Sequence, residues 1–192
     1  MEGTAQQCEM LRCIATTATQ RLFLTRGLVA IAWGVVFAIA SDSLTTGVGV
    51  LLVLYPLIDV VGNLLDGRSQ HGSARQLLLG NAAFSVLAAV ALGVAATGSV
   101  ADVLAVFGVW AGVSGAAQLV VALRRRSVFG SQWPLLLAGG FSVIAGVVFI
   151  AAAAADSTKL RMLAIYAAIG GVEFVIQAWL LARRTDQVAE AT

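Results

Sequence analysis

Six apolar runs alternate with short polar breaks along the chain. Each run has roughly 18 to 24 residues, enough for an α-helix to cross a hydrocarbon core of about 30 Å. No remaining stretch is long enough for a soluble domain. The runs lie near residues 22–40, 47–65, 77–97, 101–123, 133–155 and 160–182. The pattern predicts an all-α integral membrane bundle of six transmembrane helices, a single domain over 21–184 with tails at 1–20 and 185–192.

The composition supports a lipid environment. Hydrophobic residues make up 59% of the chain and charged residues 11%, whereas about a quarter of the residues of soluble domains are charged. The net charge of +2 is too small to indicate nucleic-acid binding. The basic residues instead form short clusters between apolar runs, as membrane flanks do. We therefore expect the lipid bilayer, and no nucleic acid, as a partner.

The distribution of basic residues predicts the orientation, because cytoplasmic loops carry an excess of Lys and Arg. One side of the membrane has only Lys159 and Arg161. The side with both termini has ten: Arg12, Arg21, Arg26, Arg68, Arg75, Arg124, Arg125, Arg126, Arg183 and Arg184. Ten against two places the N- and C-termini in the cytoplasm.

The first apolar run has a rival interpretation as a signal peptide. Arg21 and Arg26 precede an apolar stretch that ends in Ala38-Ile39-Ala40, a plausible cleavage site. Cleavage would remove a run that has a close counterpart in the fifth run and would leave five helices. We therefore expect the first run to be retained as a transmembrane helix.

An internal repeat has a period of 55 to 59 residues. Leu104–Phe107 resembles Leu163–Tyr166 at an offset of 59, and Gly34–Phe37 resembles Gly146–Phe149 at 112, about two periods. Each unit contains two apolar runs. The repeat predicts three tandem copies of a helical hairpin that run in the same direction through the membrane, at about 21–75, 76–131 and 132–184.

Small residues recur along the apolar runs at a spacing of about one helical turn. Such stripes let helix backbones approach closely in lipid. Packing within the bundle is their expected role, and an interface between copies of the chain is the alternative. The candidate packing residues are Gly34, Gly108, Gly112, Ser142, Gly146 and Gly171.

Polar residues also lie within the apolar runs, where ionised groups are costly and usually face protein or water. At the repeat offsets, Asp59, Ser114 and Glu173 are equivalent, and each is followed four residues later by an amide. The resulting candidate polar ring, with the nearby cation, is Asp59, Asn63, Ser114, Gln118, Glu173, Gln177 and Arg26. The ring holds the helices together, forms a protonatable or substrate-contacting site, or faces lipid without a specific role. Arg26 either reaches the headgroups or pairs with Asp59.

Catalytic and metal-binding signatures are missing from the sequence. His71 is the only histidine, and no hydrolase or phosphate-binding motif occurs. Cys8 and Cys13 make a weak metal site and are better explained as reduced cysteines or a site of lipid acylation. We therefore expect no enzymatic activity, no cofactor and no metal.

The order of these motifs resembles that of a known family. The motifs are Arg26-Gly27-Leu28, Gly34–Phe37, Tyr55–Asp59, Gln118–Arg124 and Gln177–Arg183. Over residues 21–184 the chain resembles the HdeD-like family of small bacterial membrane proteins. The resemblance implies a bacterial inner-membrane protein of six helices, associated in some members with resistance to acid stress, and names no reaction or substrate.

Three functional hypotheses follow. The first is a non-enzymatic membrane protein of the stress-resistance type, which acts through packing, lipid or partner contacts. The second is a small channel or transporter in which Asp59 and Glu173 line a polar path. The third is an accessory subunit that binds another membrane protein through its small-residue stripes.

Overall fold

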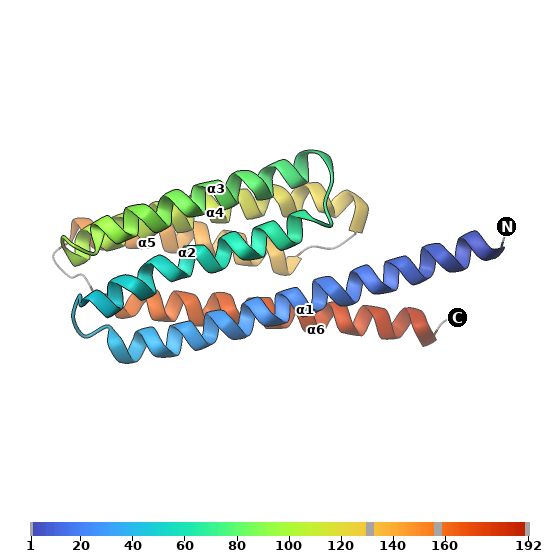
Figure 1. Cartoon of the computed structure of the whole chain (residues 1–192), viewed down its shortest axis with the longest axis horizontal. Helices are drawn as coiled ribbons and strands as arrows, with labels where there is room; N and C mark the ends of the chain where they lie inside the picture. Colours follow the sequence, from blue (N-terminus) through green and yellow to red (C-terminus); the bar gives the residue numbers. More distant parts are fainter. Residues whose placement is uncertain (1, 130–132, 156–158, 191–192) are drawn as a thin grey trace.

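The computed structural model describes residues 2–129, 133–155 and 159–190, and side chains within 18–124, 133, 135–155 and 159–183. The described residues form six helices and confirm the all-α prediction (Figure 1). The helices are α1 (Glu2–Ala40), α2 (Thr46–Gly67), α3 (Gly72–Ala95), α4 (Val100–Phe129), α5 (Trp133–Ala154) and α6 (Arg161–Glu190).

Each helix contains a segment long and apolar enough to cross a membrane. These segments are Ala18–Ala40, Thr46–Gly67, Gly72–Ala95, Val100–Arg124, Leu135–Ala154 and Arg161–Arg183. They agree with the six apolar runs to within a few residues. The chain is therefore a multi-pass membrane protein.

Both termini lie at one end of the bundle, called here the terminal end (Figure 1). The connection between α2 and α3 lies at the same end, and the α1–α2 and α3–α4 connections lie at the other. Helices α1 and α6 continue past the bundle at the terminal end, and the expected N-terminal tail, including Cys8 and Cys13, belongs to α1. The polar break expected at 156–158 and residues 130–132 lie outside the described residues.

Local side chains explain where helices begin. Thr45 Oγ1 accepts a hydrogen bond from Val48 N at 3.3 Å and caps the start of α2. At the start of α4, Ser99 N donates to Asp102 Oδ2 at 2.9 Å and Asp102 N donates to Ser99 Oγ at 3.2 Å, a reciprocal capping box. Gly72 opens α3 with φ +59°, a left-handed conformation that glycine adopts without a steric penalty.

The closest helix pairs are α1 with α6, α2 with α3, and α4 with α5. In two of these pairs the backbones touch at glycines. A Cβ added at Gly146 would lie 2.6 Å from Gly108 O, and one added at Gly171 would lie 2.8 Å from Gly27 O. Without side chains in the way, such backbones pack at close range, where dispersion contacts are strongest.

The other candidate packing residues lie at the same two interfaces. A Cβ at Gly34 would lie 3.0 Å from Ala164 O, and Ser142 lies against Gly115. Gly112 differs, because a Cβ there would meet nothing within 4 Å, although its backbone contacts α5 at Gly146. Its small size is therefore not what permits this contact.

The buried apolar core lies in the half of the bundle away from the terminal end. Phe37, Leu52, Leu92, Leu104 and Phe107 are fully buried there. Within the same core, Trp33 Nε1 donates a hydrogen bond to Leu51 O at 2.8 Å and links α1 to α2. The large apolar side chains on the outer surface, such as Leu87, Val90 and Ile144, face lipid in this arrangement. The terminal half of the bundle contains buried polar side chains, Asn63 and Asp66, together with apolar ones such as Phe23 and Leu78.

Candidate functional site

Asp59, in the middle of α2, accepts hydrogen bonds from four side chains on three helices. Its Oδ1 accepts from Arg26 Nη2 at 2.7 Å. Its Oδ2 accepts from Asn63 Nδ2 at 2.7 Å, Ser85 Oγ at 2.9 Å and Asn81 Nδ2 at 3.0 Å. A carboxylate only accepts hydrogen bonds, so a set made entirely of donors suits it. Asp59 thus ties α1 and α3 to α2.

Arg26 has further contacts besides its ion pair with Asp59. The Arg26 guanidinium carbon lies 4.6 Å from the centre of the Phe174 ring, in cation–π geometry. Its guanidinium also occupies the space that a Cβ on Gly62 would need. The Arg26 side chain is only 14% exposed. Of the two alternatives for this residue, the ion pair with Asp59 is therefore the one that the structure forms.

Two of the donors to Asp59 were missed in the sequence, and both lie on α3. Asn81 and Ser85 are one helical turn apart in an otherwise apolar run. A polar amide at Asn81 in an apolar run could have indicated a buried polar contact. Ser85 was ambiguous in the sequence, because it also fits a stripe of small packing residues. The fully buried Ser85 hydroxyl accepts a further hydrogen bond from Trp110 Nε1 at 3.0 Å. This bond carries the network on to α4.

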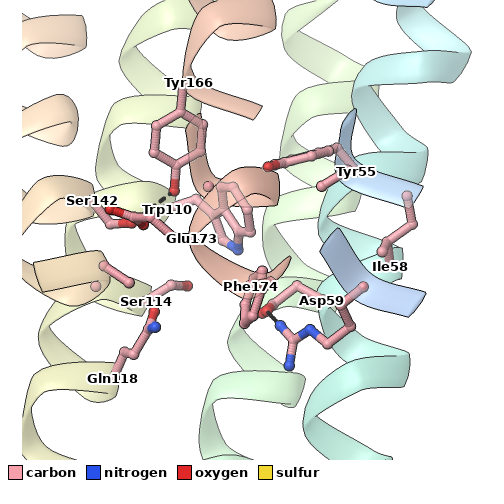
Figure 2. A pocket seen from close by; sticks show the side chains of 15 residues that line it. Tyr55, Ile58, Asp59, Trp110, Ser114, Gln118, Ser142, Tyr166, Glu173 and Phe174 are labelled. Carbon is pink, nitrogen blue, oxygen red and sulfur yellow. Dashed lines mark hydrogen bonds and ion pairs between the residues drawn. The ribbon is translucent and has the colours of Figure 1, made fainter. Parts of the chain in front are cut away.

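Glu173, Ser114 and Gln118 gather around a cavity of about 80 Å³. Arg26 and Asp59 line the same cavity, and Figure 2 shows Asp59 on the side opposite Ser114 and Gln118. Glu173 has no hydrogen bond or ion pair with any described residue. The Ser114 hydroxyl is buried and has no hydrogen-bond partner in the described part of the chain. The first cavity therefore contains both a bonded and an unbonded acid.

A second cavity of about 60 Å³ continues the first toward the terminal end. The two share Arg26, Asp59, Ser114, Gln118 and Phe174 in their linings. The second cavity is also lined by Asn81 and, nearer the terminal ends of their helices, by Asn63, Asp66, Leu77 and Leu135. Asp59, Ser114 and Glu173 are themselves eight to ten residues from those ends, or about 12 to 15 Å at 1.5 Å per residue.

The predicted polar ring is therefore split rather than continuous. Asp59 and Asn63 belong to the hydrogen-bond network, while Ser114, Gln118 and Glu173 surround the first cavity. Gln177 lines neither cavity, is 6% exposed, and its Nε2 has no partner among the described residues. The residues equivalent by repeat offset thus have different surroundings.

An aromatic layer bounds the first cavity on the side away from the terminal end. We use this name for Tyr55, Phe107, Trp110 and Tyr166. The ring centres lie 5.7 Å apart for Tyr55 and Trp110, 5.1 Å for Phe107 and Trp110, and 5.6 Å for Phe107 and Tyr166. Tyr166 OH also shares a hydrogen bond of 3.1 Å with Ser142 Oγ (Figure 2). All four side chains belong to the buried apolar core, which continues away from the terminal end.

The groups that line the first cavity are able to bind polar or charged species. Within the described ranges, no group of three or more His, Cys, Asp or Glu side chains is placed to hold a metal ion. The first cavity offers a carboxyl group, hydroxyl groups, an amide and aromatic rings. Such groups bind a small polar or charged species through oxygen atoms.

Comparison with known proteins identifies one region of similarity. No curated protein sequence and no solved structure matches the chain. Residues 83–151 match the family model of a short repeat of unknown function (DUF308). The match runs from α3 through α4 into α5 and so contains the close α4–α5 pair. Over residues 83–151 the chain is therefore similar to the DUF308 repeat, a domain found in HdeD-like membrane proteins.

Proposed function

We propose that the chain is a non-enzymatic inner-membrane protein of the HdeD-like type, which supports bacterial survival under acid or envelope stress as a closed helical bundle. The match to the DUF308 repeat supports the type. The aromatic layer is the observation that supports a closed bundle. Tyr55, Trp110 and Tyr166 fill the bundle axis on the side of the first cavity that faces away from the terminal end. A bundle sealed on one side adds no leak to a membrane under stress.

The proposal includes three parallel copies of a hairpin, with both termini in the cytoplasm. In support of the copies, the three close helix pairs each join an even helix to the next odd one, with α6 returning to α1. A three-membered ring of hairpins would have this pattern of neighbours. In support of the orientation, the terminal end carries the exposed Arg21, Arg68, Arg75, Arg124 and Arg183.

Survival of cells without the protein tests the stress role. Cells in which it is deleted should survive an acid challenge less well, and the wild-type chain should restore survival. Gly146→Leu should fail to restore it, because the added side chain would meet the α4 backbone. Gly140→Leu is a matched control on the same helix, since nothing lies within 4 Å of an added Cβ there. Equal survival of deleted and restored cells would refute the stress role.

A small channel or transporter is the second candidate, and the unbonded Glu173 in the first cavity favours it. In this case the aromatic layer would have to open during transport. Purified protein in liposomes should then pass protons, alkali ions or a small solute, and Glu173→Gln should slow the flux. Vesicles that stay as tight as protein-free ones across this panel would exclude the second candidate.

A further inference from the structure

The charges around the first cavity do not balance. Arg26 and Asp59 neutralise each other at 2.7 Å, which leaves the acid of Glu173 without a cation from the described residues. Glu173 lies on a membrane-spanning segment, about ten residues from its terminal end. An ionised carboxylate at such a depth is costly unless a positive charge accompanies it. Either a proton on Glu173 or a cation from outside the described chain would remove this cost.

The first cavity has room for that charge. A water molecule needs about 10 to 15 Å³ of cavity volume. The first cavity, with about 80 Å³, therefore holds a small ion together with several waters. Neutral oxygen atoms line the same cavity as Glu173, from the hydroxyls of Ser114, Ser142 and Tyr166 and from the amide of Gln118. The Ser114 hydroxyl is buried without a partner in the described part of the chain, and so has a free bonding capacity.

We propose that the first cavity binds a small monovalent cation, an alkali ion or a primary ammonium ion, with Glu173 as the charged ligand and Ser114, Gln118 and Tyr166 as neutral oxygen ligands. One unpaired acid matches a single positive charge. An anion fits less well, because Arg26 already bonds Asp59 and lies over the Phe174 ring. The inference does not depend on the proposed stress role.

The second cavity gives the direction from which the cation enters. It shares part of its lining with the first cavity and continues toward the terminal end, where Asp66 adds another acid. On the other side, the aromatic layer and the fully buried core side chains block the axis. The cation therefore enters and leaves from the terminal end, and the site is a dead end in this structure.

Thermal unfolding of purified protein in lipid nanodiscs tests the site. A ligand that binds only the folded state raises Tm in a saturable way. Sodium, potassium and methylammonium chloride are titrated separately, with N-methylglucamine chloride keeping the ionic strength constant, because that cation is too large for the cavity. We expect at least one small cation to raise Tm in the wild type, and the three titrations distinguish alkali ions from ammonium. The rise should disappear in Glu173→Gln and persist in Asp42→Asn, a matched loss of an exposed acid.

A second variant tests the site if Glu173→Gln does not fold. Ser114→Ala removes one neutral oxygen, and we expect the half-saturating cation concentration to rise by about 2- to 10-fold, the effect of one neutral partner. The proposal is overturned if small and large cations give the same Tm in the wild type. It is also overturned if the cation effect survives in Glu173→Gln, or if Glu173 proves to bind a proton instead, seen as a Tm that depends on pH and not on the cation.

Discussion

The ion pair of Arg26 and Asp59 allows a quantitative prediction for Asp59→Asn. The substitution keeps the size of the side chain and replaces one carboxylate oxygen with an NH₂ group. Because donors approach both oxygens, Arg26 at Oδ1 and three others at Oδ2, the new NH₂ must face a donor in either orientation. The variant also leaves the Arg26 charge without its acid.

The burial of the pair sets the magnitude. Breaking a buried ion pair by removing one partner costs about 3 to 5 kcal/mol, whereas exposed pairs contribute about 0 to 1 kcal/mol. The two side chains are 14% and 18% exposed, which is close to the buried limit. We therefore expect Asp59→Asn to lower the free energy of unfolding by about 2 to 4 kcal/mol. Removing Arg26 as well, in Arg26→Gln/Asp59→Asn, should recover part of this loss because no unpaired charge remains.

Equilibrium unfolding in mixed detergent and SDS micelles, followed by far-UV circular dichroism, measures these free energies. Asp42→Asn is the control, since this exposed acid lies in the α1–α2 connection and should change stability by less than about 0.5 kcal/mol. A loss below about 1 kcal/mol for Asp59→Asn would contradict the account, because the pair would then behave as an exposed one. Strictly additive effects of the two substitutions would contradict it as well.

Three further predictions concern packing and orientation. Gly146→Ala should lower the free energy of unfolding by about 1 to 3 kcal/mol, because its Cβ would meet the α4 backbone. Gly140→Ala on the same helix should change this free energy little. Equal effects of the two substitutions would refute the close α4–α5 contact. Gly62→Ala should displace the Arg26 guanidinium and lower the free energy of unfolding by a similar amount. The double variant Gly62→Ala/Asp59→Asn should lose less free energy of unfolding than the two single variants together. Additive losses would show that Gly62 acts independently of the ion pair. A reporter fused to either terminus should be active only in the cytoplasm, and a periplasmic signal would reverse the predicted orientation.

The membrane-spanning helices were readily predicted, because each depends only on the apolar character of its own consecutive residues. A run of about 20 apolar residues must form a helix in lipid, where every backbone polar group needs an internal partner. The helix ends were also close to the polar breaks, since Thr45 and the Ser99–Asp102 box cap helices through short-range hydrogen bonds. Neither inference requires knowledge of distant parts of the chain.

The site was predicted only in part. Asp59 and Glu173 stand out in sequence because charges are rare in apolar runs, and the spacing of Asn63 from Asp59 places both on one helix face. The roles of Asn81 and Ser85 could not be assigned, because they depend on which face α3 presents to α2.

The sequence by itself determined the class of protein, the six spans and the positions of the acids within them, because these follow from the cost of placing polar groups in lipid. Only the tertiary structure decided that Asp59 is fully bonded while Glu173, at the equivalent repeat position, faces a cavity. The reason is the neighbouring helix. Helix α3 offers Asn81 and Ser85 to Asp59. Helix α1 contributes Ala30 and Arg26 to the cavity beside Glu173, but Ala30 has no polar group and Arg26 bonds Asp59 instead.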